Sequence, residues 1–275
     1  MTTRLAAVDL DGTLIGGDLA ISDVDRAAIA RAVESGIRVV LVTGRLFSAS
    51  RPFAKDLGLH GPLAGLQGAV VYDVDSGDLL HATPLSASVA LAAYDALLLK
   101  HYDIQLYFGD SLYLDHMSPA SAEYIRLSRV EPVMVPDLRS LLTGAAPAGA
   151  LLKLLAIGAP DAVTGDIEPL AASLGAAANV CRSLAHYLEV TDSNADKGHA
   201  LVRIAALLGV HLTESVAIGD SDNDVPMFRV VAESFAVANA TEAARRAATR
   251  TVAARGSGVA EALTLVAKGD ACGRT

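Results

Sequence analysis

The sequence predicts an α/β protein that has a Rossmann-like core of parallel strands and an α/β cap inserted between the two halves of that core. Two observations favour this fold. Strand-like and helix-like segments alternate in the first third and again in the last third of the chain, whereas the middle is richer in tyrosine and proline and lacks that alternation. We therefore expect a first core part at 1–83, a cap at 84–186 and a second core part at 187–275.

The first third predicts a parallel βαβ unit. The apolar stretch 4–10, "RLAAVDL", is typical of a buried strand, and residues 22–36 form an amphipathic helix with Ser22 as its N-cap and Gly36 at its end. The run 37–45, "IRVVLVTGR", lacks polar alternation, which indicates a strand buried on both faces. Two strands joined by a helix of this length pair in parallel.

The remaining segments follow the same division. Residues 69–83 predict a hairpin around an Asp-Ser-Gly-Asp turn, and the cap contains helical and strand segments at 88–100, 103–108, 111–115, 121–130, 131–135 and 151–158. In the last third we expect helices at 197–209, 222–231 and 258–268, and strands at 215–220 and 234–239.

Composition excludes several classes of protein. The 275 residues carry a formal net charge of −9, which argues against binding to nucleic acid or to anionic membranes. Cys181 and Cys272 have no metal-binding or redox spacing, which favours a reducing compartment, and Lys153 interrupts the best candidate for a membrane span. We find no signal peptide and expect a cytoplasmic protein; its oligomeric state is left open.

Polar side chains gather where the predicted strands and helices meet. In open α/β sheets, ligands bind beyond the carboxyl ends of the strands. A cluster of carboxylates there requires a cation or raised pKa values, and Mg²⁺ with oxygen ligands suits it best. The groups that reach this edge are Asp9, Asp11, Thr43, Lys197, Asp220, Asn223 and Asp224.

Four short segments, in their order and spacing, resemble the motifs of the haloacid dehalogenase-like phosphatases. They are "DLDGTL" at 9–14, "VTGR" at 42–45, "DKG" at 196–198 and "GDSDNDVPM" at 219–227. The late lysine motif and the long insertion resemble the Cof-type branch, which carries a cap of the C2B type. The resemblance implies hydrolysis of small phosphomonoesters, such as sugar phosphates or related metabolites, with Mg²⁺ and an aspartyl-phosphate intermediate.

The resemblance also implies roles for individual residues. Asp9 is the nucleophile, and Asp11 is the general acid and base whose backbone carbonyl also binds the metal. Thr43 and Lys197 complete the catalytic group. The phosphate is bound by Leu10, Thr43, Gly44, Lys197 and Asn223, with an outer-sphere contact to the metal as the alternative for Asn223; Asp9, Asp11 and Asp220 hold Mg²⁺, and Asp224 orients Lys197 or the metal waters.

One position departs from the family pattern. Gln67 stands where these phosphatases usually have asparagine, which puts in doubt a hydrogen bond that the shorter amide would make. Two other functions stay open at this point. A phosphomutase would share the cap type and the motifs, and a catalytically silent phosphate-binding module would share the fold, although it would be expected to lose at least one of the principal site residues.

Overall fold

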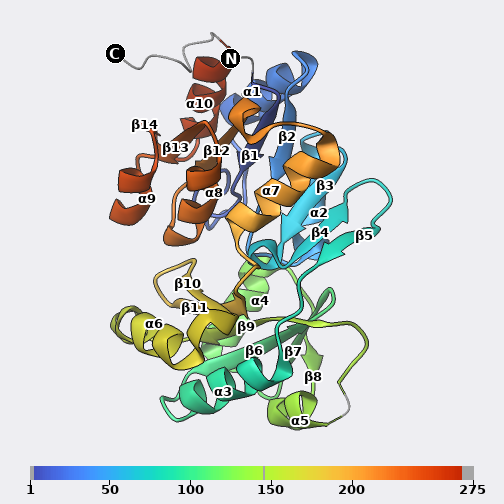
Figure 1. Ribbon diagram of the computed structural model, residues 1–275, viewed down its shortest axis with the longest axis vertical. Coiled ribbons are helices and arrows are strands. Elements are labelled where there is room, and N and C mark those ends of the chain that lie inside the picture. The colour runs from blue at the N-terminus through green and yellow to red at the C-terminus, as the bar shows by residue number, and fades with distance from the viewer. Residues whose placement is uncertain (1–2, 145, 268–275) are drawn as a thin grey trace.

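The computed structural model describes residues 3–144 and 146–267, and Cys272 lies outside them. In this part of the chain three sheets form, and Figure 1 shows the core sheet above and the cap sheet below. The prediction of an α/β fold with a parallel-sheet core is confirmed.

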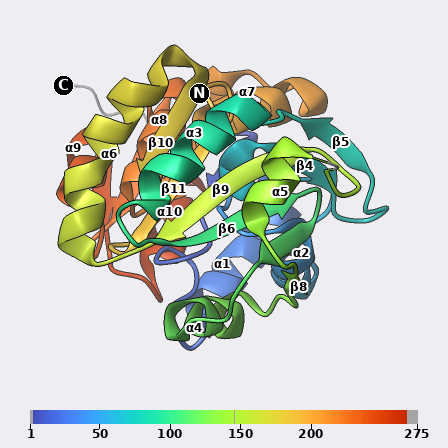
Figure 2. The same cartoon turned by 90° about the horizontal axis from the view of Figure 1, so that it is seen from below.

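The core sheet has the strand order β14-β13-β12-β1-β2, and every pair in it is parallel. Helices α7 and α8 cover one face and α1 and α10 cover the other (Figures 1 and 2). Its strands are β1 (Leu5–Val8), β2 (Arg38–Leu41), β12 (Ser215–Gly219), β13 (Glu233–Val237) and β14 (Arg250–Val252). Its helices are α1 (Asp23–Glu34), α2 (Phe47–Asp56), α7 (Lys197–Leu208), α8 (Val225–Val230), α9 (Glu242–Ala247) and α10 (Gly258–Ala267).

Local sequence signals set the ends of these elements. Ser22 caps α1 as predicted, because its hydroxyl accepts a hydrogen bond from the Asp25 backbone N–H at 3.0 Å. The Asp25 carboxylate is itself buried, and it accepts the Ala260 N–H at the start of α10. The capping turn of one helix thus also ties the two helices of this face together.

A small antiparallel sheet joins the core to the cap. The predicted hairpin is confirmed, since β4 and β5 pair antiparallel, and a strand that the sequence analysis did not single out, β3, pairs with β4 on its other side. Between β3 and β4 lies a 3-10 turn at Leu66–Gly68. The strands are β3 (Pro62–Gly65), β4 (Val70–Asp73) and β5 (Leu79–Ala82).

The cap sheet has the order β10-β11-β9-β6-β7-β8, and α3 and α6 cover its face away from the core (Figure 2). Its strands are β6 (Asp103–Phe108), β7 (Ser111–Leu114), β8 (Val133–Met134), β9 (Leu151–Ile157), β10 (Ala178–Arg182) and β11 (Tyr187–Asp192). Its helices are α3 (Ala87–Leu98), α4 (Pro119–Ser128), α5 (Leu138–Thr143) and α6 (Pro160–Leu174).

Strand β11 continues this sheet past the residue at which the sequence analysis began the second core part. It pairs antiparallel with β9 and with β10, so residues 187–192 belong to the cap sheet, and residues 188–190 have a cap strand on both sides. The chain returns to the core sheet only with α7 and β12.

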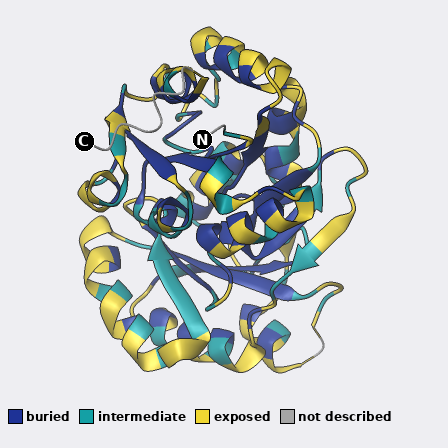
Figure 3. Ribbon diagram, turned by 45° about the horizontal axis from the view of Figure 1, so that its top comes forward, coloured by how far each residue is buried: buried dark blue, intermediate teal, exposed yellow. Residues whose placement is uncertain are grey.

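Alternation along the central cap strands gives the sheet two different faces. Leu154 and Ala156 of β9 pack among the residues under α3 and α6, whereas Leu155 and Ile157 belong to the cluster on the face toward the core. Figure 3 shows the central strands of both large sheets buried, strand β10 at the edge of the cap sheet of intermediate burial, and the outer helix faces exposed. The core-facing side of the cap therefore covers the carboxyl ends of the core strands.

No helix among the described residues is both long enough and apolar enough to span a membrane.

Candidate active site

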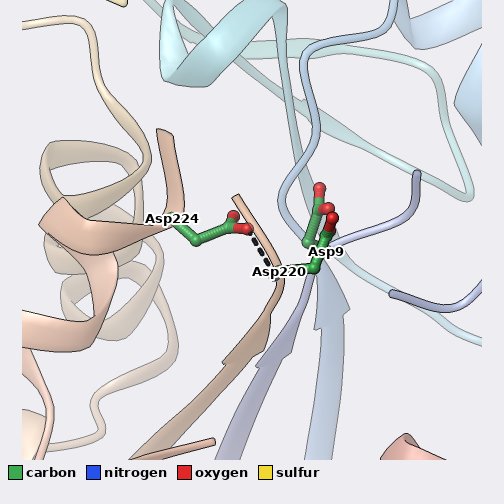
Figure 4. Close-up of side chains that lie close together, drawn as sticks. All are labelled: Asp9, Asp220 and Asp224. Carbon is green, nitrogen blue, oxygen red and sulfur yellow. Dashed lines mark hydrogen bonds between the residues drawn. The ribbon is translucent and has the colours of Figure 1, made fainter. Parts of the chain in front are cut away.

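Asp9 and Asp220 follow two neighbouring parallel strands, and this places them side by side. The register pairs Val8 with Ile218, so β1 and β12 end at the same edge of the sheet. Figure 4 shows the two carboxylates projecting together from the ends of these strands. The sequence analysis expected them to meet here, and the structure brings them together.

Gly12 leaves the space that this arrangement needs. Its φ is +85°, which L side chains rarely adopt, and a Cβ at this position would lie 2.3 Å from Asp220 Oδ2. Any other residue would therefore collide with the carboxylate of Asp220. Thr13, the next residue, donates from its hydroxyl to Asp220 Oδ1 at 2.8 Å.

Lys197 lies at the start of α7, with its side chain 1% exposed, and it connects two of the carboxylates. Its Nζ donates to Asp9 Oδ1 at 2.5 Å and to Asp224 Oδ1 at 2.7 Å. Burial alone would lower the pKa of Lys197, but the carboxylates of Asp224 and Asp9 outweigh that effect and raise it. Lys197 is thus held as a cation at the site.

Both carboxylate oxygens of Asp224 accept hydrogen bonds from groups of the site. Its Oδ2 accepts the backbone N–H groups of Asp220 at 2.8 Å and Ser221 at 2.9 Å, and its Oδ1 accepts Lys197. The dashed line in Figure 4 marks the bond to Asp220. Asp224 therefore fixes both the loop that carries Asp220 and the position of Lys197.

The electrostatics of the remaining pair fit a divalent cation. Burial, followed by the nearby charge of Asp224, raises the pKa of Asp220 to about 7, and burial raises the pKa of Asp9 as well. Ligand atoms of Asp9, Asp220 and Asp224 all lie within 4.8 Å of one another. Asp9 Oδ2 and Asp220 Oδ2 take part in none of the hydrogen bonds above, so a hard cation such as Mg²⁺ has two carboxylate oxygens to bind.

Asp11 lies apart from this cluster and is bound by Arg45. The guanidinium donates to Asp11 from Nε at 2.7 Å and from Nη2 at 2.6 Å, and its Nη1 donates to the Leu127 carbonyl of α4 at 2.9 Å. Arg45 therefore joins the strand-end loop of β2 to the cap. The sequence analysis had quoted Arg45 within a motif but had given it no role.

The loop before Arg45 holds Thr43 and Gly44 at the end of β2. Thr43 is buried, and its hydroxyl accepts the Arg45 N–H at 3.3 Å. Leu10 is buried between the two aspartates, and its carbonyl accepts the N–H groups of Leu14 and Ile15. Helix α2 begins only at Phe47, so Thr43 and Gly44 lie in the connecting loop rather than in the first turn of that helix.

A cavity of about 240 Å³ lies between core and cap, and Asp9 is on its floor. Pockets for drug-sized ligands occupy roughly 300–1,000 Å³, so this cavity suits a small metabolite. Asp9, Asp11 and Gly44 line it from the core. The cap contributes Tyr124, Leu127, Lys153, Leu184, Tyr187 and Glu189.

The cap side contains a buried ion pair that the sequence analysis missed. Lys153 Nζ lies 2.7 Å from Glu189 Oε2, with the two side chains 2% and 3% exposed. Lys153 also donates to the Gly44 carbonyl at 2.8 Å and lies over the ring of Tyr107. A lone lysine inside the apolar run of β9 was the available signal, because a buried charge needs a partner.

Gln67 connects the cap to the core site. Its Nε2 donates to Glu189 Oε1 at 2.9 Å, and its Oε1 accepts from Asn223 Nδ2 at 2.9 Å. Asn223 Oδ1 is buried and has no hydrogen-bond partner among the described residues. The residue that departs from the family pattern thus bridges an acidic residue of the cap and an amide of the core.

Comparison with known proteins identifies the family. The model of the haloacid dehalogenase-like hydrolases matches residues 6–263. A pyridoxal phosphate phosphatase of Escherichia coli (strain K12) is 28% identical over 251 residues, which cover 89% of this chain and 91% of that protein. A 5-amino-6-(5-phospho-D-ribitylamino)uracil phosphatase of Bacillus subtilis (strain 168) is 28% identical over 262 residues, which cover 87% and 89%.

A solved structure shows the same fold. The crystal structure of a haloacid dehalogenase-like hydrolase from Bacteroides thetaiotaomicron superposes with a TM-score of 0.81 at 26% identity, and the match covers 96% of this chain and 100% of that one. The family match spans both core halves and the cap. The chain therefore belongs to the haloacid dehalogenase-like hydrolases, as a phosphatase of their Cof-type branch.

Proposed function

We propose that this phosphatase hydrolyses small phosphomonoesters at the cavity between core and cap, with Asp9 as the nucleophile. The observation that carries this assignment is the position of Asp9. It lies on the floor of the cavity, is held by Lys197 at 2.5 Å, and has Asp220 beside it. A buried nucleophile beside a fixed cation is the arrangement that phosphoryl transfer requires.

The first step transfers the phosphoryl group. An Asp9 carboxylate oxygen attacks phosphorus, the bond from phosphorus to the ester oxygen breaks, and that oxygen takes a proton from the carboxyl group of Asp11. Lys197 offsets the negative charge that gathers around phosphorus in the transition state. The alcohol leaves, and an aspartyl-phosphate remains on Asp9.

The second step regenerates the enzyme. Water attacks the phosphorus of the aspartyl-phosphate, Asp11 accepts its proton, and inorganic phosphate leaves with the Asp9 carboxylate restored. Both Asp11 oxygens are occupied by Arg45 in this structure. Asp11 must therefore exchange Arg45 for the substrate oxygen before it donates its proton.

Binding of the remaining groups follows from the same geometry. Asp9 and Asp220, with the backbone carbonyl of Asp11, would hold Mg²⁺, which supplies positive charge to the phosphoryl oxygens when it is bound. We assign the phosphate to Thr43, Gly44, Leu10 and Lys197, which surround Asp9 on the loops after β1 and β2 and at the start of α7.

The substrate class follows from the cavity. Its size limits the alcohol part to a small metabolite, and the cap offers both aromatic rings and a buried ion pair. Two relatives are named as phosphatases of pyridoxal phosphate and of a phosphoribitylamino-uracil, so phosphorylated heterocycles belong in the test beside sugar phosphates. A cytoplasmic location stays a prediction.

The test measures phosphate release from p-nitrophenyl phosphate, pyridoxal phosphate and a hexose 6-phosphate, with Mg²⁺ or with a chelator. We expect Mg²⁺-dependent release by the wild type and none by Asp9→Asn. Asp78→Asn, the same change at an exposed position of the hairpin, serves as the matched control. Retained activity in Asp9→Asn would overturn the assignment, and transfer of phosphate between sugar positions without its release would identify a mutase.

A further inference from the structure

Gln67 stands in the centre of a hydrogen-bonded chain that runs from the cap into the active site. Glu189 of β11 accepts from Gln67, and Gln67 accepts from Asn223, three residues after Asp220. All three side chains are buried, at 2%, 1% and 8% exposure. Such buried polar chains fix the direction of every amide in them, because each group has a limited set of donors and acceptors.

Glu189 determines the direction of the hydrogen bonds in this chain. An ionised carboxylate can only accept hydrogen bonds, and Glu189 is ion-paired with Lys153. Gln67 must therefore turn its NH₂ group toward Glu189 and its carbonyl toward Asn223. Asn223 must in turn give its NH₂ group to that carbonyl, so its Oδ1 is the atom left over.

The unpaired Asn223 Oδ1 indicates what kind of group this residue binds. Asn223 Oδ1 is a buried acceptor without a partner among the described residues, on a residue that lines the same cavity as Asp9. The oxygens of a phosphomonoester dianion only accept hydrogen bonds and cannot satisfy it, whereas water bound to a cation is a strong donor. The orientation thus fits the outer-sphere role that the sequence analysis left open for Asn223, rather than contact with phosphate.

The fold maintains Gln67 at a conformational cost. Leu66 and Gln67 have φ values of +49° and +60°, a region that residues other than glycine visit rarely. Glycine at position 44 leaves room for the Gln67 amide, since a Cβ there would lie 2.5 Å from Gln67 Nε2. Strained backbone persists where the surrounding structure requires it, often at functional sites.

We propose that Gln67 is a positioning residue. Its hydrogen bonds to Glu189 of the cap and to Asn223 of the core hold the Asn223 amide in one orientation, in which Oδ1 of Asn223 accepts a hydrogen bond from magnesium-bound water. This inference rests on the proposed function and makes a separate claim. Metal affinity depends on Gln67, a residue that contacts neither the metal nor the phosphate. The cap thereby assists metal binding in the core.

The experiment measures the melting temperature as a function of MgCl₂ concentration, without substrate, which reports binding of the metal alone. Gln67→Met keeps the length of the side chain and removes both hydrogen bonds. We expect its dissociation constant for Mg²⁺ to rise by about 10-fold, the lower end of the 10–100-fold loss usual for residues that orient metal ligands. Gln105→Met is the matched control, because Gln105 is equally buried, in β6, but bonds within the cap.

A charge-conserving double variant separates orientation from packing. In Gln67→Glu/Glu189→Gln the new carboxylate accepts from both neighbouring amides, so Asn223 keeps its direction. We expect this variant to bind Mg²⁺ within about 3-fold of the wild type, well inside the loss expected when the orienting partner is removed.

Two results would overturn the proposal: equal Mg²⁺ affinity in Gln67→Met and the wild type, or a double variant as weak as Gln67→Met. Failure of the proposed function would show elsewhere, as absence of Mg²⁺-dependent phosphate release by the wild type. The two claims therefore fail in different experiments.

Discussion

Replacing Asp220 with asparagine should stabilise the metal-free protein while it abolishes activity. Burial and the charge of Asp224 raise the pKa of Asp220 from 3.8 to about 7, so its ionised form is unfavourable in the folded chain. Asparagine keeps the shape and the oxygen that accepts from Thr13, but it carries no charge. The folded protein thus carries an electrostatic cost at Asp220 that a bound cation would offset.

The magnitude follows from the pKa. Each tenfold change in proton affinity is worth about 1.4 kcal/mol, so this rise corresponds to at most about 4 kcal/mol. Because the replacing amide must also be buried, we expect Asp220→Asn to gain about 1–4 kcal/mol at about pH 8. At this chain length that is a rise of about 2–8 °C in melting temperature.

The sign depends on pH. Between about pH 4 and pH 7 Asp220 binds more protons in the folded wild type than in the unfolded chain, so its contribution to stability falls as pH rises through this window. Asp220→Asn does not lose this stability, because asparagine at position 220 does not ionise. The difference in melting temperature should therefore be near zero at about pH 4 and reach its full value above about pH 7.

The assay is thermal unfolding followed by circular dichroism in the presence of a chelator, at several pH values. Asp78→Asn, at its exposed site, should match the wild type throughout. Excess Mg²⁺ should raise the melting temperature of the wild type and leave that of Asp220→Asn unchanged. An Asp220→Asn protein that melts below the wild type at about pH 8 without metal would refute the electrostatic reasoning.

Three further predictions concern the same residues. Asp11→Asn should lower kcat for an alkyl phosphate by about 10²–10⁴-fold in steady-state assays, and a fall of less than tenfold would contradict its role in proton transfer. Lys197→Met should cost about 3–5 kcal/mol in urea unfolding, because it leaves Asp9 and Asp224 buried without their cation; unchanged stability would argue against the ion pairs. The rise in wild-type melting temperature caused by Mg²⁺ should grow from about pH 5 to about pH 7 as protons cease to compete for Asp220, and a flat profile would count against the metal site.

The sequence predicts well which site residues lie at the strand ends, because their place at one edge of the sheet depends only on the order of strands and helices along the chain. The parallel βαβ unit places Asp9 and Thr43 at one edge, and the return of the same pattern in the last third places Asp220 there. Strand direction alone brings these groups together, whatever the details of side-chain packing. This part of the site therefore needed only local patterns.

The cap side of the site could not be predicted in the same way. The ion pair between Lys153 and Glu189 depends on the register of two strands, and the bond from Gln67 to Glu189 joins residues 122 positions apart. Local patterns do not contain such pairings. The pair of Arg45 with Asp11 was missed for the same reason, since it depends on how the loops after β1 and β2 meet.

The central claim is that Asp9 becomes phosphorylated during turnover, and Asp11→Asn offers the most direct test. p-Nitrophenol leaves without help from an acid, whereas hydrolysis of the intermediate needs a base, so this variant should accumulate the aspartyl-phosphate. Reaction of Asp11→Asn with p-nitrophenyl phosphate and Mg²⁺, followed by acid quench and peptide mass spectrometry, should show one burst of p-nitrophenol per site and a phosphoryl group on Asp9. A burst without modification, or a phosphoryl group on another residue, would contradict the account.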